Sequence, residues 1–176
     1  MPTPDAAALA RAESLIAVTP DYPQPGVLFR DIAPLLADAA ALRTVVDALT
    51  APFAGRFDVV AGVEARGFLL AGAAAIATGA GLVPIRKAGK LPRPAASVAY
   101  ALEYGEAVLE MHDDIAPGTR VLLVDDVLAT GGTLGAAREL LARVQGDVVG
   151  TAVLLELDLG GRGILGDEAL HAVFRL

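Results

Sequence analysis

The sequence predicts an α/β fold with an open, mostly parallel sheet flanked by helices. Short apolar runs alternate with helix-like stretches, which is the pattern of successive βαβ units. The runs are rich in Val and Leu without strict polar alternation, as expected of strands covered by helices on both faces. A chain of 176 residues with 55% hydrophobic and 20% charged side chains also suits one compact domain, which we expect to span residues 1–176.

The individual elements follow from the same hydrophobic pattern. The segment 1–18 favours a short amphipathic helix. The other expected elements are, in chain order, a strand at Phe57–Gly62, a helix at Gly67–Ala77, strands at Leu82–Ile85 and Val121–Val124, a helix at Thr133–Val144, and strands at Val148–Leu155 and Leu170–Leu176.

The uncharged segment Gly67–Ile85 is about as long as a membrane span, which takes roughly 20 residues. The stretch Thr78–Gly81 contains a helix stop and a turn, so we expect a helix, a turn and a strand instead. The N-terminus lacks the basic start and long apolar stretch of a secretory signal. These features predict a soluble cytoplasmic protein with no membrane partner.

Charge and composition exclude several classes of site. Fourteen Lys and Arg against twenty-one Asp and Glu give a net charge of −7, so there is no global basic field for a nucleic acid. The chain has no Cys and two widely separated His residues, which argues against disulfides and zinc sites. An anionic ligand therefore has to be held by local chemistry.

The segment Arg86–Asp114 departs from the βαβ pattern. A polar stretch rich in Lys, Gly and Pro precedes two alternating runs, Ser97–Leu102 and Ala107–His112. This order predicts a long loop followed by a β-hairpin. Connections longer than about 12 residues are uncommon in compact domains and are often functional.

The most informative segment is Val121–Thr133, VLLVDDVLATGGT. A buried strand is expected to deliver Asp125 and Asp126 at its carboxyl end, where open α/β sheets bind ligands. The following turn consists of Ala129, Thr130, Gly131, Gly132 and Thr133, and it leads into a helix. Its backbone amides and the positive end of the helix dipole suit a phosphate, and its threonines add hydroxyl donors.

The two acids would repel a phosphate placed directly on them, but they suit vicinal ribose hydroxyls or a nearby Mg²⁺. The segment thus predicts a ribose 5-phosphate site. Either half alone is commonly structural, since Asp-Asp is frequent in turns and Thr-Gly-Gly-Thr at helix starts. Their order along the chain is what favours the functional interpretation.

This thirteen-residue segment resembles the phosphoribosyl pyrophosphate motif of the type I phosphoribosyltransferase family. Further segments resemble its adenine phosphoribosyltransferase branch: Asp21–Ile32, Ala65–Phe68, Ile85–Pro92 and Leu102–Gly105. The resemblance covers about Asp21–Glu156. It implies the family fold, with a small hood at residues 1–35 that reads the base and a flexible lid loop and hairpin at residues 86–112.

The resemblance implies that adenine and 5-phosphoribosyl 1-pyrophosphate (PRPP) give AMP and pyrophosphate, with Mg²⁺ carried by PRPP and possible contacts from Asp125 and Asp126. It also implies a homodimer. A phosphoribosyltransferase for another purine base and a non-catalytic PRPP-sensing regulator of the same fold are the alternatives.

The resemblance also assigns roles to individual residues. It places Arg66, Lys87, Lys90 and Tyr104 at the pyrophosphate, and it assigns catalysis to Glu103, Arg66 and Lys87, with Glu103 near N7 of the base. The expected adenine pocket contains Leu28, Phe29, Arg30 and Leu128, with Phe29 and Leu128 on opposite faces of the base. One departure from the family pattern is Glu64-Ala65-Arg66 in place of Asp-Ser-Arg, which leaves the support of Arg66 open.

The segment Gly161–Gly166 matches the Gly-x-Gly-x-x-Gly pattern of dinucleotide-binding sites. Only ten residues follow it, too few for the rest of a βαβ unit and its acidic residue. We therefore expect a turn before the final strand. Gly89-Lys90 likewise lacks the preceding Gly and the following Ser or Thr of a nucleoside-triphosphate loop.

Overall fold

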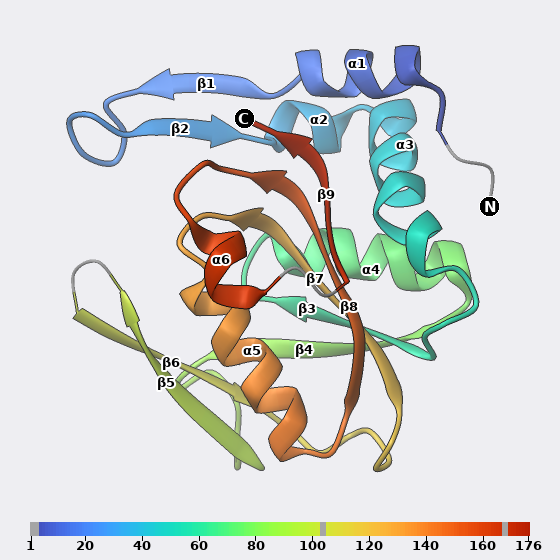
Figure 1. Ribbon diagram of the computed structural model, residues 1–176, viewed down its shortest axis with the longest axis vertical. Coiled ribbons are helices and arrows are strands. Elements are labelled where there is room, and N and C mark those ends of the chain that lie inside the picture. Colours follow the sequence, from blue (N-terminus) through green and yellow to red (C-terminus); the bar gives the residue numbers. More distant parts are fainter. Residues whose placement is uncertain (1–3, 103–104, 167–168) are drawn as a thin grey trace.

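A seven-stranded sheet forms the centre of the computed structural model, which describes residues 4–102, 105–166 and 169–176 (Figure 1). The strand order is β5-β6-β4-β3-β7-β8-β9. The strands are β3 (Val59–Val63), β4 (Gly81–Lys87), β5 (Ala96–Leu102), β6 (Gly105–Met111), β7 (Arg120–Leu128), β8 (Asp147–Glu156) and β9 (Leu170–Arg175). The five neighbouring strands β4-β3-β7-β8-β9 pair in parallel. The β5–β6 hairpin is antiparallel, and β6 joins the edge of β4 in antiparallel pairing. The predicted mostly parallel sheet is confirmed.

Helices cover both faces of this sheet. The helices are α1 (Ala6–Ser14), α2 (Ala33–Ala37), α3 (Ala39–Thr50), α4 (Gly67–Thr78), α5 (Gly132–Arg143) and α6 (Gly161–Leu165), with a 3₁₀ turn at Ala51–Phe53. Buried side chains of α3 and α4 form one core cluster against the sheet, and those of α5 form a second cluster on the opposite face. Burial on both faces explains why the central strands are continuously apolar.

A separate two-stranded sheet lies outside the main sheet, between α1 and α2 (Figure 1). Its strands are β1 (Ala17–Pro20) and β2 (Leu28–Asp31), paired antiparallel with Phe29 opposite Thr19. The connecting turn contains Gly26 at φ +85°, a conformation that glycine adopts without strain. This hairpin and α1 lie within the segment 1–35 for which the family resemblance implies a hood.

The charge-free segment after Gly67 folds as expected. Helix α4 ends at Gly79, which takes the left-handed conformation, and β4 follows from Gly81. Within the described ranges no helix is long and apolar enough to cross a membrane.

Three expectations about local structure were wrong or incomplete. Strand β7 does not end at Val124 but continues to Leu128, because β8 pairs with it as far as Glu156. Residues 161–165 form helix α6 and not a simple turn. Helix α3 was not predicted, although Asp38 caps it by accepting a hydrogen bond from the Ala41 amide at 2.8 Å.

Candidate active site

A cleft of about 310 Å³ opens where the parallel strands β3, β4 and β7 end. Carboxyl ends of parallel strands meet at one edge of a sheet, and open α/β sheets bind ligands there. The lining residues come from the ends of these strands, the hairpin and the start of α5: Glu64, Lys87, Tyr100, Ala107 and Asp125–Leu134.

The predicted phosphate turn forms one wall of this cleft. Gly131 is the residue before α5 and has φ +87°, so glycine is required there. The cap residue Gly131 has no side chain to accept from the first amides of α5, and these amides have no partner within the helix. Thr133 faces the hairpin, with its hydroxyl 3.4 Å from that of Tyr100. The turn therefore offers backbone donors and the helix dipole to an anion.

The two acids lie inside β7 and not after it. Asp125 and Asp126 are each 6% exposed and both line the cleft. The Asp126 amide donates to Asp125 Oδ1 at 2.8 Å. Burial, and then the neighbouring Asp126 carboxylate, raise the pKa of Asp125. Two adjacent buried carboxylates repel each other and lose hydration, and such perturbed groups are typical of functional sites.

Arg66 connects the acids to the β1–β2 hairpin. It stands just before α4, and its Nη2 forms an ion pair with Asp126 Oδ2 at 2.9 Å. Its Nη1 donates to the Arg30 carbonyl oxygen at 3.5 Å, and its guanidinium lies 5.4 Å from the centre of the Phe29 ring. The structure thus brings a predicted pyrophosphate residue and a predicted adenine residue into contact.

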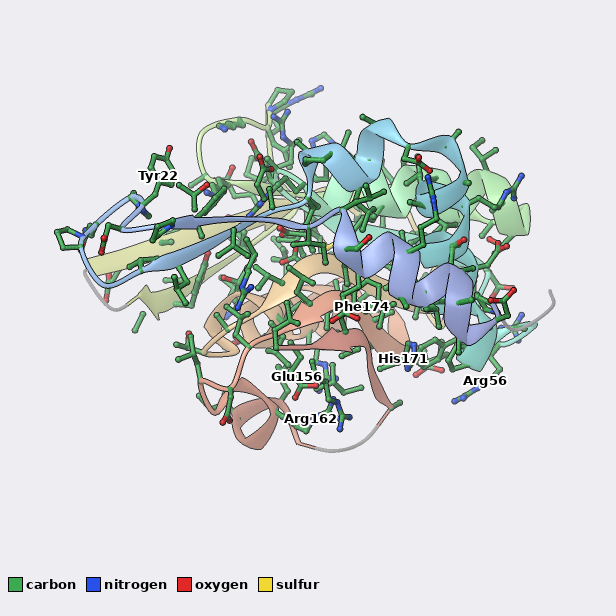
Figure 2. The ribbon with its side chains drawn as sticks, turned by 90° about the horizontal axis from the view of Figure 1, so that it is seen from above. Tyr22, Arg56, Glu156, Arg162, His171 and Phe174 are labelled. Carbon is green, nitrogen blue, oxygen red and sulfur yellow. The ribbon has the colours of Figure 1, made fainter. Side chains whose placement is uncertain are left out.

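The other predicted adenine residues are divided between two elements. Leu28 is 56% exposed on β2. Tyr22, which lies near the turn of the hairpin (Figure 2), packs edge-on against Phe29 with ring centroids 5.1 Å apart. Leu128 is buried at the end of β7 and lines the cleft. Leu28, Phe29 and Arg30 are not among the lining residues of the cleft.

Glu64 forms hydrogen bonds with both predicted lysines. Its carboxylate accepts hydrogen bonds from Lys90 Nζ, from the Lys87 amide at 3.0 Å and from Arg86 Nε at 3.4 Å. Burial works against ionisation, but these donors together lower the pKa of Glu64 to about 2. Lys87 lines the cleft, whereas Lys90 is held against Glu64. Glu64 therefore acts on Lys90, and its described polar contacts do not include Arg66.

Glu103 and Tyr104 lie outside the described residues, so their expected roles stay predictions. Sequence reasoning missed Tyr100 and Glu64 as cleft residues. The departure from the family pattern at Glu64 was the available signal for the second of these.

Comparisons with known proteins agree with this architecture. The family model described as a phosphoribosyl transferase domain matches residues 36–163. An adenine phosphoribosyltransferase of Renibacterium salmoninarum is 58% identical over 166 residues, covering 93% of this chain and 91% of that protein.

Solved structures of adenine phosphoribosyltransferases are also similar to this chain. The crystal structure of adenine phosphoribosyltransferase from Rhodothermus marinus has a TM-score of 0.91 at 45% identity and covers 98% of this chain and 100% of its own. The Saccharomyces cerevisiae enzyme, complexed with an imino-altritol bisphosphate and adenine, has a TM-score of 0.90 at 33% identity, covering 97% and 100%. The chain belongs to the adenine phosphoribosyltransferases, within the phosphoribosyltransferase family.

Proposed function

We propose that this chain transfers the phosphoribosyl group of PRPP to adenine, giving AMP and pyrophosphate in purine salvage. The observation that carries the proposal is the cleft in which the Asp125–Asp126 pair adjoins the turn at residues 129–133. Relatives that bear the name adenine phosphoribosyltransferase support the choice of base.

The 5-phosphate of PRPP binds at the start of α5 in this proposal. Amides of Gly131, Gly132 and Thr133 and the hydroxyls of Thr130 and Thr133 donate to its oxygens, and Ala129 completes the turn. Asp125 and Asp126 accept hydrogen bonds from the ribose hydroxyls. These contacts fix the sugar so that its anomeric carbon faces the base.

Substitution at the anomeric carbon breaks its bond to pyrophosphate, and the electron pair leaves with the pyrophosphate oxygen. Arg66, Lys87 and Lys90 stabilise the negative charge that develops there, since charge-assisted hydrogen bonds strengthen with charge. Lys90 leaves Glu64 for this purpose. Tyr104 belongs to the lid at residues 86–112, which closes over the site and excludes water.

Adenine lies between Phe29 and Leu128 in this proposal, with backbone groups around Arg30 reading its edge. Its N9 forms the new bond, and Glu103 takes the proton that the purine loses. We expect Glu103→Gln to lower kcat by roughly 10² to 10⁴, the range for general acid–base groups. Near-normal turnover of that variant, measured as AMP formed at saturating substrates, would exclude this role.

The cleft also fits a magnesium ion brought by PRPP. Among the described residues no three metal-ligating side chains gather, but Asp125 and Asp126 both line the cleft. Mg²⁺ is commonly held by one or two carboxylates together with substrate phosphates. When bound, the ion supplies positive charge against the pyrophosphate.

Two further features belong to the proposal. An apolar face of α4 and β4 supports the expected homodimer, because Leu69, Ile76 and Leu82 are 57%, 87% and 49% exposed. The absence of cysteine from the sequence suits a reducing cytoplasm, where we expect the reaction to take place.

The function is tested by measuring product formation from PRPP and Mg²⁺ with each of five bases: adenine, guanine, hypoxanthine, xanthine and uracil. AMP from adenine alone is the expected result. Turnover of another base would contradict the assignment of the pocket at residues 28–30. Tight PRPP binding without any turnover would favour the regulator.

A further inference from the structure

The start of α6 packs directly against the turn that follows β7. A Cβ built on Gly161 would overlap the carbonyl oxygen of Ala129 and would lie 2.7 Å from Leu128 Cδ1 and 2.9 Å from the Gly131 nitrogen. Conversely, a Cβ on Gly131 would lie 2.8 Å from the Gly161 carbonyl oxygen. Real Cβ atoms essentially never approach this closely, so the two backbones leave no room for a side chain at either position.

Polar contacts hold α6 in this place. Arg162 donates from Nε and Nη2 to the two carboxylate oxygens of Glu156 at 2.7 and 2.6 Å, and from Nη1 to the Leu170 carbonyl at 3.2 Å. Figure 2 shows Glu156 and Arg162 together beside α6. Glu156 is the β8 partner of Leu128, and the Leu157 amide donates to the Leu128 carbonyl at 2.9 Å. Through Glu156, these contacts connect helix α6 to Leu128, the last residue before the turn.

We propose that α6 is a buttress for the phosphate-binding turn and that Gly161 is a positioning residue for the 5-phosphate of the substrate. The inference rests on the proposed function of that turn. The turn at residues 129–131 leaves β7 at Leu128, and Gly161 and the Arg162–Glu156 pair fix its far side. A side chain at Gly161 displaces Ala129 and Gly131, and with them the amides that face the phosphate.

The decisive comparison is Gly161→Ala against Gly163→Ala in the same helix. A Cβ at Gly163 meets no described atom within 4 Å, so this control adds the same methyl group without a clash. Isothermal titration with ribose 5-phosphate probes the turn without the base. We expect Gly161→Ala to raise Kd for ribose 5-phosphate and KM for PRPP by about 10- to 100-fold, the cost of displacing a positioning group by about 1 Å. The control should stay within about twofold of the unaltered protein.

Equal affinities of the two variants for ribose 5-phosphate would overturn the inference. Circular dichroism establishes whether Gly161→Ala folds. If it does not, Arg162→Met decides, because it loosens α6 without adding a clash: a raised Kd for ribose 5-phosphate with an unchanged KM for adenine supports the buttress, and an unchanged Kd overturns it.

A failure of the proposed function would be detected by a separate measurement, the formation of AMP. The unaltered protein would then bind ribose 5-phosphate but form no AMP, and the comparison of the two glycine variants would still decide the role of Gly161. An unaltered protein that forms AMP but binds no ribose 5-phosphate overturns the inference alone, and one that does neither overturns both.

Discussion

Asp125 illustrates, at the scale of one residue, how a binding site lowers the stability of the fold. Burial and the Asp126 carboxylate raise its pKa above the ordinary value of 3.8. A raised folded-state pKa means that the contribution of the residue to stability is fully present below pH 3.8 and is lost as the pH rises through the raised value. At neutral pH, above the ordinary value, this raised pKa therefore destabilises the folded state relative to the unfolded state.

We expect Asp125→Asn to raise Tm at pH 7 by about 2–4 °C, which corresponds to about 1 kcal/mol in a domain of this size. The asparagine side chain keeps the same shape and an oxygen that accepts a hydrogen bond from the Asp126 backbone amide. Unlike the carboxyl group, it cannot carry a negative charge. The same change should lower kcat/KM, because the ribose loses a charged acceptor. Thermal unfolding of both proteins from pH 3 to pH 8 tests the sign. The two Tm curves should meet below pH 3.8, and a variant less stable at pH 7 would contradict the argument.

The Glu64 carboxylate is expected to weaken substrate binding. Its carboxylate holds Lys90, so pyrophosphate has to compete with it for the same ammonium group. Since Lys90 is half exposed and exposed pairs contribute at most about 1 kcal/mol, Glu64→Gln should lower KM for PRPP by up to about fivefold.

Glu110→Gln is the matched control for this variant. Glu110 lies on β6 and accepts a hydrogen bond from the Gly89 amide at 3.1 Å, so the change removes one charge beside the same loop without touching Lys90. Steady-state kinetics of both variants give the comparison. A KM for PRPP that rises in Glu64→Gln but not in the control would mean that Glu64 positions Lys90 for the substrate and does not compete with it.

The β1–β2 hairpin is the element that is expected to set base specificity. Phe29 on β2 contacts Arg66 at 5.4 Å, which joins the hairpin to the cleft. Stacking of a base on an aromatic ring contributes about 1–3 kcal/mol, so Phe29→Ala should raise KM for adenine by about 10-fold or more and affect KM for PRPP less. Phe29→Leu keeps an apolar side chain and should show most of the same loss. Equal increases in both KM values would argue against a stacking role.

The elements also show which parts of the fold a sequence pattern predicts. Strands β3, β4 and β8 and helices α4 and α5 were predicted because their burial imposes a pattern on their own residues. The end of β7 was not, because two adjacent acids are typical of a turn, and only pairing with β8 keeps them in a strand. Helix α6 contains two glycines and depends on the Arg162–Glu156 contact, which no local signal reveals.

The candidate site divides in the same way. The turn at residues 129–133 and the acids before it were found from local chemistry, and the family resemblance supplied Arg66, Phe29 and the lysines. The contact between Arg66 and Phe29 joins residues 37 positions apart, by 66 − 29 = 37, and arises from tertiary packing alone. For the same reason the hydrogen bond from Lys90 to Glu64 has no signature in the sequence.

At the scale of the whole molecule, the face formed by α3 and α4 leaves apolar surface exposed. A groove between α3 and α4 is lined mostly by apolar residues, and Ile76 of α4 is 87% exposed beside it. Apolar surface of this kind is typical of an interface, and in a homodimer it would be removed from water. The cleft opens at the strand ends, so a partner on this helical face leaves the strand ends accessible.

We therefore expect Ile76→Arg to convert the proposed homodimer into a monomer, because it would place a charge in the proposed interface while leaving the core of the subunit intact. Ile164→Arg is the control: Ile164 is 68% exposed on α6, which packs with α5 on the opposite side of the sheet, and should not affect assembly. Sedimentation velocity over a range of protein concentrations measures the mass of each species. A dimer that survives Ile76→Arg, or dissociates equally in both variants, would show that this face of α4 is not the interface.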